Sequence, residues 1–310
     1  MTDFIEIYCK IKNKIETSPF ENVIDYPLVS SVVCPRDKAL HKGSAGRLLV
    51  CGGSTGLTGA PIMSCQAALR SGAGLVTLAC AEELNTIFEI RLTEVMTMPV
   101  DSKNGSIAFG AYDKICDKMN HSDGFLIGPG LSVTEDIVKL VHMLISESET
   151  PLVIDADGIN AVAKNTDILK KTKAPVILTP HIGEFARLCN REISEVIDKK
   201  EELAKDFCDR FGVNLVLKSH ETVVVSPEGT VYRNVLGNPG MAVGGSGDVL
   251  SGIIASFVCQ KKPVLDSALA GVFFHSLAAD FAVYEYGEYS LIPTDIINYL
   301  PKALMVERNR

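Results

Sequence analysis

The chain lacks the cysteine spacings of a disulfide framework or a zinc knuckle. Its nine cysteines are scattered and odd in number, and no two of them form a Cys-x-x-Cys pair. Disulfide-rich domains and structural zinc sites both depend on regular, closely spaced ligands. Cys51 and Cys80 fall inside apolar runs, where a reduced cysteine behaves as a small apolar side chain. The pattern therefore predicts free thiols and a cytoplasmic location.

Long basic and long apolar runs are also missing. No cluster of Lys or Arg stands out among 30 basic and 38 acidic residues, and the net charge is −8. Because a nucleic-acid-binding surface normally carries a basic face, we expect no nucleic-acid partner. Residues 1–14 contain early acidic residues and no long apolar stretch, so they do not resemble a secretory signal. The most apolar segment, 268–284, is broken by His275 and Asp280, short of the ~18 uninterrupted residues of a membrane span. We expect a buried helix there and no membrane partner.

Short apolar runs alternate with longer segments in which apolar residues recur every three or four positions. The runs expected to form strands are 48–52, 75–80, 125–128, 152–155, 176–179 and 213–218. Strands that are apolar throughout, with helices between them, indicate a parallel sheet covered on both faces. Residues 222–234, with Pro227 and Gly229 near the centre, predict a β-hairpin. The predicted fold is a three-layer α/β/α sandwich around a mostly parallel sheet.

Residues 1–40 differ from the rest of the chain. They carry a weak helical pattern at Ile7, Ile11 and Ile15, and three prolines follow it. No repeat, low-complexity stretch or linker interrupts the remainder. We therefore expect an N-terminal extension, 1–40, followed by a single domain, 41–310.

Small or polar residues directly follow five of the expected strands. These segments are GGSTG (52–56), GPG (128–130), DADG (155–158), PHIGE (180–184) and SHET (219–222). In an open parallel sheet, ligands bind in the crevice beyond the carboxyl ends of the strands. One such loop is weak support, because loops are generally rich in Gly, Pro and Asp. Five in one chain predict a substantial ligand site.

The segment 237–252, GNPGMAVGGSGDVLSG, places a glycine-rich turn before Asp248 and an amphipathic helical pattern. Backbone N–H groups at a helix start, here those of Gly245, Ser246 and Gly247, attract anions and above all phosphate. A structural interpretation competes, in which Asp248 only caps the helix. Taken alone, the pattern favours the cap, whereas the other motifs of the chain favour an anion site.

GGSGD resembles the GxGD signature of ribokinase-like kinases. With it come, in order, KGSAGR (42–47), GGSTGLTGA (52–60), GPGL (128–131), DADGIN (155–160), TPHIGEF (179–185) and NPGMAVGGSGDVLSG (238–252). Together these motifs resemble the ADP-dependent NAD(P)H-hydrate dehydratases of that superfamily, over about residues 41–260. The resemblance implies a ribokinase-like fold and dehydration of the S form of hydrated NADH or NADPH. ADP, used with Mg²⁺, would be the phosphoryl donor, and AMP and phosphate would be released.

The resemblance also assigns roles to matching positions. Asp248 would be the catalytic carboxylate that touches the substrate hydroxyl, and Gly244, Gly245, Ser246 and Gly247 would form the anion hole. Hydrated dinucleotide would contact Ala60, Gly130, His181 and Asp248. The adenine nucleotide would contact Gly247 and the segment Lys218, Ser219, His220, Glu221 and Thr222. The family usually has Lys-Gly where this chain has Lys218-Ser219, and a Cβ would shift that loop if the position required a positive φ.

Other polar residues are interpreted as structural. His275 lies in an apolar helical pattern, and Asp155 and Asp157 are interpreted as loop-structuring residues, so no protein metal site is predicted. The helix dipole favours the charged form of Asp248, which makes it a weak base in this interpretation. GGSTG does not have the G-x-G-x-x-G spacing of a dinucleotide-binding Rossmann turn, so we expect no dehydrogenase.

Two alternatives stay open. One is a ribokinase-like kinase of a small vitamin precursor or sugar, which would leave a stable phosphate ester. The other is a non-catalytic nucleotide-binding sensor. Many relatives carry an additional epimerase domain, which residues 1–40 are too few to form, so no epimerase activity is expected. We expect a homo-oligomer whose ligands are ADP or AMP and hydrated NADH or NADPH.

Overall fold

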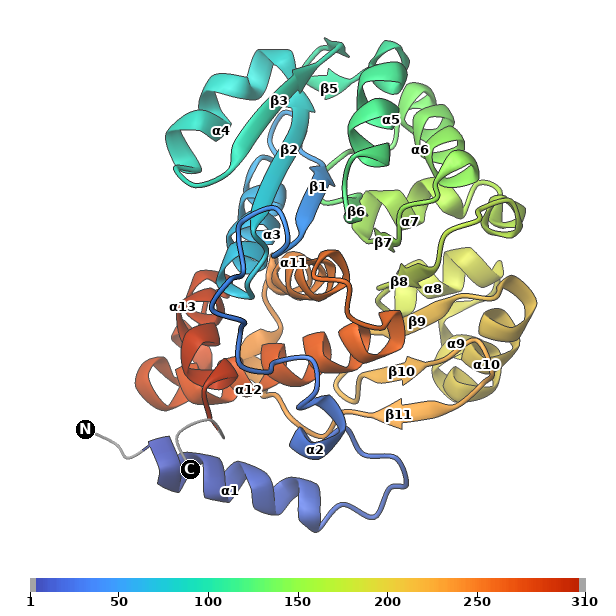
Figure 1. The fold of residues 1–310 in the computed structure, drawn as a ribbon. Coiled ribbons are helices and arrows are strands. Elements are labelled where there is room, and N and C mark those ends of the chain that lie inside the picture. Colours follow the sequence, from blue (N-terminus) through green and yellow to red (C-terminus); the bar gives the residue numbers. More distant parts are fainter. Residues whose placement is uncertain (1–3, 307–310) are drawn as a thin grey trace.

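The computed structural model describes residues 4–306 and centres on one nine-stranded sheet (Figure 1). Its order is β11-β10-β9-β8-β7-β6-β1-β2-β3, and only β10 and β11 run antiparallel to their neighbours. The strands are β1 Arg47–Cys51, β2 Leu75–Ala81, β3 Met96–Val100, β6 Gly124–Ile127, β7 Leu152–Ile154, β8 Val176–Leu178, β9 Asn214–Leu217, β10 Val223–Val225 and β11 Val231–Arg233. The predicted mostly parallel sheet is confirmed.

All six expected strands and the hairpin β10–β11 are present. The edge strand β3 and the two-stranded sheet of β4 Ser102–Lys103 and β5 Ser106–Ile107 were not predicted from the sequence. Met96 in β3 is exposed and Pro99 cannot donate a ladder hydrogen bond. Because an edge strand needs neither a continuous apolar run nor every N–H, its sequence carries little strand signal.

The order of the strands decides which face each helix covers. From β1 the chain moves outward to β2 and β3, and it then returns past β1 to β6 and continues to β9. Right-handed crossovers place helices of the two directions on opposite faces. Helices of the first direction are α3 Gly59–Arg70 and α4 Asn85–Arg91, with η1 Glu82–Leu84. Those of the second are α5 Tyr112–Asn120, α6 Glu135–Glu147, α7 Ala156–Val162, α8 Ile182–Cys189, α9 Ile193–Asp198 and α10 Lys200–Phe211, with η2 Phe109–Ala111 and η3 Thr166–Lys170.

After β11 the chain returns to the face of α3. The returning elements are η4 Pro239–Met241, α11 Ser246–Cys259, α12 Val264–Ser290 and α13 Pro293–Leu304. Helix α11 packs on β1, β6 and β7, while α12 reaches β8 and β9 (Figure 1). A Cβ on Gly252 of α11 would collide with the backbone of Ser64 in α3, so these helices pack backbone to backbone. The three layers predicted from the sequence are therefore present.

Helix α12 is the one described helix long and apolar enough to span a membrane, but 89% of its most apolar window is buried inside the fold. Residues 267–282 are all buried, and they include His275 and Asp280. The helical geometry breaks at Gly287, which has a φ of 71°. The expected buried core helix is confirmed.

The N-terminal residues pack on this core. Helix α1, Phe4–Glu16, buries Ile7 and Ile11 and contacts α12, which confirms the helical pattern. A short helix, α2 Tyr26–Val29, also contacts α12. Val23 forms a parallel bridge with Arg233 of β11. The boundary between an extension and the domain at residue 40 remains a prediction.

Candidate active site

Side chains at two glycines around the start of α11 would meet close neighbours. Gly245, the N-cap, has a φ of 101°, and a Cβ there would lie 2.5 Å from Met63 Cε. A Cβ on Gly247 would lie 3.0 Å from Lys218 Nζ. Helix α11 has no side-chain cap, so Asp248 in its first turn is not the helix cap that the isolated pattern favoured. The Ser246 N–H, one of the three predicted anion donors, donates to Val243 O at 3.3 Å.

Three strand ends bring a buried ion pair under this turn. Lys218 Nζ lies 2.9 Å from Asp155 Oδ1, which also accepts a 2.8 Å hydrogen bond from Thr179 Oγ1. Asp155 follows β7, Thr179 follows β8 and Lys218 follows β9, so parallel pairing alone carries them to one edge. Burial opposes the charge of Lys218, but the surrounding carboxylates, Asp155 first, outweigh it and raise the lysine pKa above its usual value. The ammonium is therefore a fixed positive charge beside Gly247.

Two further carboxyl groups near Lys218 have pKa values that are raised to near neutral pH. Burial, with a contribution from Asp155, raises the pKa of Asp248 to about 7, although Lys218 acts in the opposite direction. Burial likewise raises the pKa of Glu184 to about 7. The sequence-based expectation of a weakly basic, ionised Asp248 is therefore wrong. Loss of solvation outweighs the helix dipole, and the carboxylate becomes an effective base near neutral pH.

His181 begins α8 and is fixed by its own helix. Its Nδ1 accepts hydrogen bonds from Gly183 N at 3.0 Å and Glu184 N at 3.3 Å, and its backbone N–H donates to Glu184 Oε2 at 2.8 Å. Burial, then Lys218 and Arg187, lower the pKa of the imidazole. With Nδ1 as the acceptor, the neutral ring carries its proton on Nε2. His181 Nε2 lies 3.5 Å from Glu184 Oε1. Because the His181 side chain is 55% exposed, this nitrogen can donate to a ligand.

Ala60 and Gly130 meet where the strand order reverses between β1 and β6, the usual place for a ligand in such a sheet. Gly130 has a φ of +64°, and a Cβ there would lie 2.5 Å from Leu57 O and 3.3 Å from Ala60 Cβ. Ser64 Oγ donates to both Ala60 O at 3.2 Å and Asp248 O at 3.0 Å. The structure thus brings Ala60, Gly130 and Asp248 together.

The segment 218–222 forms a turn closed by its own side chains. Ser219 Oγ donates to Glu221 O at 2.7 Å, and Thr222 Oγ1 donates to Ser219 O at 3.1 Å. Lys200 Nζ, which the sequence analysis did not select, donates to Glu221 O at 3.0 Å. His220 and Glu221 are exposed. Ser219 is not among the residues with positive φ, so its Cβ does not strain the loop.

The residues interpreted as structural have structural contacts, with one addition. Asp157 accepts a hydrogen bond from Ser132 N at 2.8 Å, and buried His275 has Nε2 3.4 Å from Ser246 Oγ. Burial lowers the pKa of His275 to about 4, so the ring is neutral. Asp155 does more than shape its loop, because it pairs with Lys218. Within residues 4–306, no three His, Cys, Asp or Glu side chains group as metal ligands.

Sequence reasoning missed Glu184 and Asp280. The spacing His181-x-x-Glu184 at a helix start was the available signal for the first, since it matches a capping box. Asp280 of α12 gives no such signal. It accepts hydrogen bonds from Gly237 N at 3.0 Å and Asn238 Nδ2 at 2.9 Å, and so fixes the loop that leads into the glycine-rich turn.

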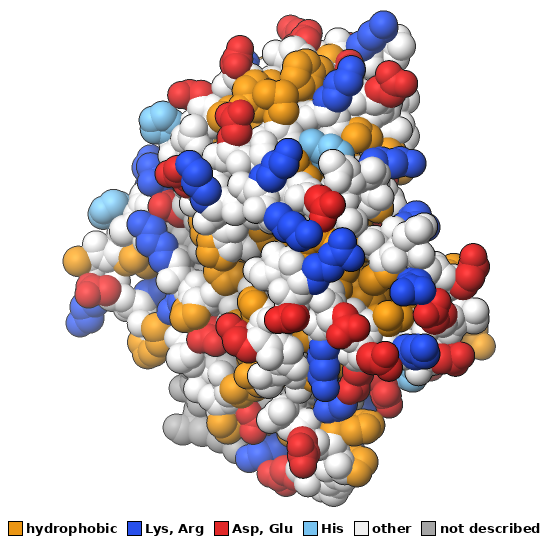
Figure 2. All heavy atoms as spheres, turned by 90° about the vertical axis from the view of Figure 1, so that its right-hand side faces the viewer, with side chains coloured by type: hydrophobic (Ala, Val, Ile, Leu, Met, Phe, Trp, Pro, Cys, Tyr) orange, Lys and Arg blue, Asp and Glu red, His pale blue; other side chains and the backbone are white. Residues whose placement is uncertain are grey.

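A groove of about 380 Å³ runs along α8 and α9 and begins at Gly183, beside the His181 ring. Arg187 lines it and donates from Nε to Asn160 Oδ1 at 2.9 Å. Seen from the side of α8, α9 and α10, lysine and arginine side chains lie across the middle of this face, with many carboxylates below them (Figure 2). We call Asp248, Asp155, Glu184 and Lys218 the Asp248 cluster; none of them lines the groove, which lies beside this cluster.

Known proteins resemble this chain over most of its length. The sequence model of the NAD(P)H-hydrate dehydratase family matches residues 48–302. A bifunctional NAD(P)H-hydrate repair enzyme of Moorella thermoacetica is 40% identical over 271 residues, which cover 87% of this chain and 51% of that protein. An ADP-dependent (S)-NAD(P)H-hydrate dehydratase of Neisseria meningitidis is 34% identical over 244 residues, which cover 77% of this chain and 78% of that protein. The chain spans about half the length of the bifunctional relatives it matches.

Solved structures agree with these matches. The ADP/ATP-dependent NAD(P)H-hydrate dehydratase of Bacillus subtilis, co-crystallised with ATP/Mg²⁺, superposes with a TM-score of 0.78 at 29% identity. The superposition covers 92% of this chain and 98% of that one. A ribokinase-like superfamily protein of Enterococcus faecalis gives a TM-score of 0.81 at 28% identity, over 94% and 98% of the two chains. The predicted ribokinase-like fold is confirmed, and the chain belongs to the NAD(P)H-hydrate dehydratase family.

Proposed function

We propose that the chain catalyses the ADP-dependent dehydration of the S form of hydrated NADH or NADPH. One observation carries the proposal: Asp248 lies in the first turn of α11, after a glycine-rich turn and beside the Lys218 ammonium, where burial raises the pKa of its carboxyl group to about 7. A base near neutrality and fixed donors for a phosphoryl group are what transfer from a nucleotide to a hydroxyl requires.

Each predicted contact has a place in this proposal. Asp248 faces the hydroxyl of the substrate, while Gly244, Gly245, Ser246 and Gly247 surround the phosphoryl group. Ala60, Gly130 and His181 hold the hydrated nicotinamide half, with His181 donating from Nε2. The adenine nucleotide lies against Gly247 and the segment Lys218, Ser219, His220, Glu221 and Thr222. Lys218 adds a positive charge where negative charge gathers during transfer.

The reaction proceeds in two stages. The terminal phosphoryl group of ADP moves to the hydroxyl on C6 of the nicotinamide ring, so that the bridging P–O bond breaks and AMP leaves. Asp248 accepts the hydroxyl proton as the new P–O bond forms. The C6–O bond then breaks with help from the ring nitrogen lone pair, and phosphate departs with both electrons of that bond. Loss of a proton from the neighbouring carbon restores the double bond.

In this proposal, Mg²⁺ is bound by the phosphates of the nucleotide and not by a site of the protein alone. The described residues offer no three-ligand group for a resident ion, and both contacts of Asp155 Oδ1 are taken by Thr179 and Lys218. Mg²⁺ commonly binds through phosphate oxygens, water and one or two carboxylates. It would enter with ADP and neutralise phosphate charge. The scattered cysteines without a Cys-x-x-Cys pair support a cytoplasmic location, and the homo-oligomeric state remains a prediction.

The test is incubation of the purified chain with hydrated NADH and either ADP or ATP, with products separated. We expect the absorbance of reduced nicotinamide to return, with AMP and free phosphate in equal amounts when ADP is the donor. A stable phosphate ester instead would identify a kinase. Thermal stabilisation by ADP without turnover would identify a nucleotide-binding sensor. Either result would reject the dehydratase proposal.

A further inference from the structure

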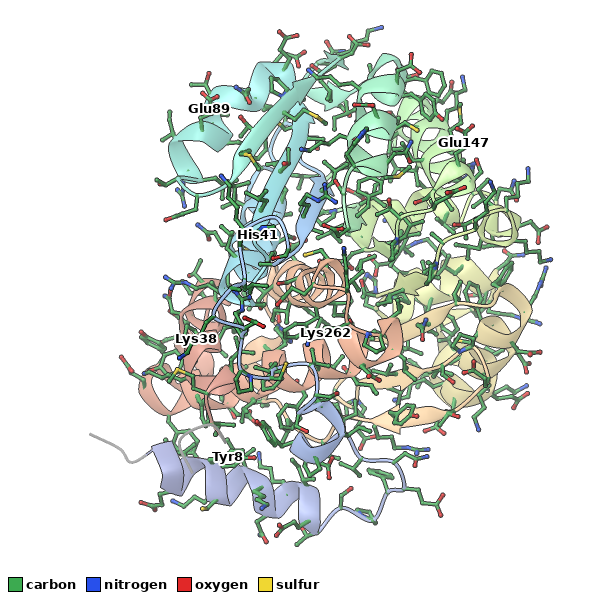
Figure 3. The ribbon with its side chains drawn as sticks, viewed as in Figure 1. Tyr8, Lys38, His41, Glu89, Glu147 and Lys262 are labelled. Atoms are coloured by element: carbon green, nitrogen blue, oxygen red, sulfur yellow. The ribbon has the colours of Figure 1, made fainter. Side chains whose placement is uncertain are left out.

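A second hollow, of about 360 Å³, lies at the amino ends of the strands, opposite the Asp248 cluster. We call it the basal pocket. Residues 32–37 and Leu40 form one wall, and the C-terminal ends of α3 and α11 form the other. Figure 3 labels Lys38 and His41 on the N-terminal segment, and Lys262 near it. Asp248 lies at the start of α11 and the basal pocket lies at its end, and a helix of this length spans about 20 Å. The two sites therefore do not overlap.

The charged side chains that line the basal pocket are mostly positive. Arg36, Arg70 and Lys262 face a single carboxylate, Asp37. Among residues 4–306, none of these three cations forms an ion pair with a carboxylate. The chain as a whole carries a net charge of −8, so a cluster of unpaired cations departs from its general balance. A concave group of unpaired cations attracts an anion.

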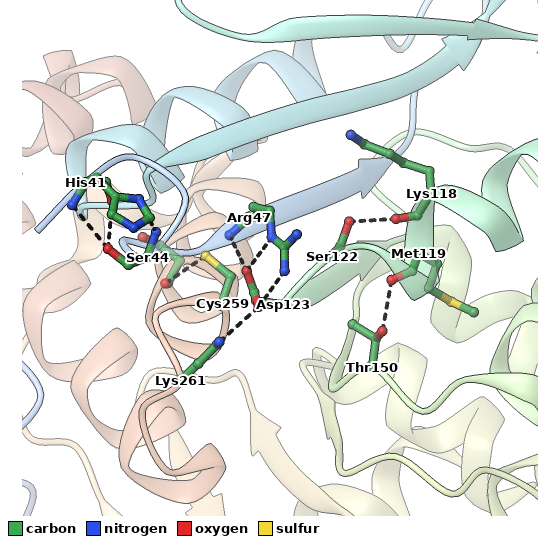
Figure 4. A network of polar contacts seen from close by, with 11 residues as sticks. His41, Ser44, Arg47, Lys118, Met119, Ser122, Asp123, Thr150, Cys259 and Lys261 are labelled. Atoms are coloured by element: carbon green, nitrogen blue, oxygen red, sulfur yellow. Dashed lines mark hydrogen bonds and ion pairs between the residues drawn. The ribbon is translucent and has the colours of Figure 1, made fainter.

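Two other cations at the same end of the sheet do form ion pairs with a carboxylate. Asp123 accepts from Arg47 Nε at 2.9 Å and lies 3.3 Å from Lys261 Nζ (Figure 4). These two cations therefore have a carboxylate of their own. Lys262, the next residue after Lys261, donates instead to Ser31 O at 3.4 Å and Cys34 Sγ at 3.6 Å. The fold thus gives Arg47 and Lys261 a shared carboxylate partner, whereas Lys262 has only neutral partners.

Carbonyl and amide groups fix Arg36 in place. Arg36 Nη2 donates to Gly72 O and to Gln260 Oε1, and Gln260 Nε2 in turn donates to Ser71 O at 3.0 Å. A guanidinium has five N–H donors, so Arg36 retains donors for a ligand. Ser71 also lines the pocket, and its Oγ is a buried oxygen without a partner among the described residues.

Both walls of the basal pocket also carry apolar side chains. These are Val32, Val33, Leu40, Ala45, Phe257 and Leu304. A pocket lined by both cations and apolar side chains suits a ligand with an anionic group and a short carbon body. The volume is near the lower end of the ~300–1,000 Å³ typical of small-molecule sites. Two guanidinium groups and an ammonium match a doubly charged phosphate better than a single carboxylate.

We propose that the basal pocket binds a small phosphate monoester, with its phosphate on Arg36, Arg70 and Lys262 and its carbon body on Leu40, Phe257 and Leu304. The ligand would bridge residues 32–40 to the ends of α3 and α11. This site is separate from the proposed catalytic centre and does not depend on the proposed function.

Cys34 supplies a local readout, because it lines the basal pocket, is exposed and contacts Lys262. The full chain is alkylated with iodoacetamide in increasing glycerol 3-phosphate, at constant ionic strength set with NaCl, and the rate is followed for each cysteine-containing peptide. We expect saturable slowing at Cys34. Exposed Cys9 on α1, outside the pocket, is the internal control and should keep its rate. Absence of slowing at Cys34 would overturn the proposal.

Matched variants separate specific binding from charge screening. Lys262→Gln and Arg36→Gln should each raise the half-saturating concentration about tenfold or more, since a charge-assisted hydrogen bond contributes ~1.5–3 kcal/mol. Lys261→Gln removes the same charge from the adjacent, already paired position and should change nothing. Equal weakening by Lys261→Gln would reject the pocket, and equal protection by inorganic phosphate would reject a monoester as its ligand. If Arg36→Gln fails to fold, Lys262→Gln still decides.

Discussion

Asp248 and Asp123 are carboxylates at opposite ends of the same sheet, and their surroundings shift their pKa values in opposite directions. Burial raises the pKa of Asp248 to about 7, helped by Asp155. Burial also opposes the charge of Asp123, but hydrogen bonds from Arg47 and Lys261 outweigh it and lower its pKa below the usual value. The two carboxyl groups therefore differ in two ways: Asp248 is the more deeply buried, and only Asp123 accepts hydrogen bonds from cations that outweigh the effect of burial on its pKa.

The opposite pKa shifts distinguish Asp123, which stabilises the fold, from Asp248, which is proposed to react. A carboxylate paired with cations in the folded state adds stability at neutral pH, whereas one crowded by other carboxylates costs stability and is kept near its protonation midpoint. Such costs are common at sites that transfer protons. Under the proposed function, the carboxyl end of the sheet is the reactive end, and the Lys218 ammonium offsets the repulsion among the carboxylates gathered there.

The largest expected effect comes from removing that lysine. Lys218→Met leaves Asp155 buried with no cation within 4 Å, and breaking a buried pair from one side typically costs ~3–5 kcal/mol. Urea denaturation at pH 8 should show a loss of that size in the free energy of unfolding. Adding Asp155→Asn should recover much of it. Lys261→Met at the other end, where the lysine is exposed, should cost less than ~1 kcal/mol. Equal losses at both ends would contradict the contrast.

Asp248→Asn comes next and tests the reactive end directly. The amide keeps the shape of the side chain but accepts no proton, so turnover of hydrated NADH with ADP should fall ~10²-fold or more. ADP binding, measured by calorimetry, should remain nearly unchanged. Asp123→Asn is the matched control and should retain turnover, since Asp123 lies at the amino end of β6, far from the site. Near-normal turnover in Asp248→Asn would remove Asp248 from the reaction.

The same comparison shows which features a sequence can reveal. The strands were predictable because β1, β2, β6, β7, β8 and β9 are apolar along their whole length, and parallel pairing then brings their following loops to one edge. Ala60, Gly130, His181 and Lys218 follow that rule, whereas Asp248 comes after the antiparallel β11 and was found from the GGSGD motif. Strand β3 escaped prediction because an exposed edge carrying Pro99 has no such pattern.

The electrostatic state of Asp248 was not predictable from its own segment. The helix dipole is a local property that suggested a fully ionised group. Its pKa of about 7 depends on burial and on Asp155, Lys218, Asp157 and Glu184, which come from segments 30 or more residues earlier in the chain. A local motif identifies the residue, and only the packed loops determine how readily it accepts a proton.

A smaller effect concerns stability and pH. The raised pKa of Asp248 means that its ionisation weakens the fold as pH rises from the unfolded value near 4 through about 7. Asp248→Asn should therefore increase the free energy of unfolding by about 1 kcal/mol or more at pH 8, and by less at pH 5.

Asp123→Asn should have the opposite sign. Its lowered pKa stabilises the fold above the unfolded value and is lost only as pH falls through the folded value, so the variant should lose stability at both pH 5 and pH 8. Denaturation curves of both variants and the unsubstituted chain at the two pH values provide the measurement. A stabilising Asp123→Asn would show that Arg47 and Lys261 do not hold this carboxylate.

The smallest expected effect is at Ser219, where the family usually has glycine. Ser219 does not have a positive φ, and its Oγ donates to Glu221 O, so serine suits this turn without strain. Ser219→Gly removes that bond and adds freedom to the unfolded chain, which together should cost ~1 kcal/mol or less. The KM for ADP should change less than about threefold, because a loss of ~0.6 kcal/mol already corresponds to that factor. A large gain in ADP affinity on Ser219→Gly would mean that the turn must rearrange to admit the nucleotide.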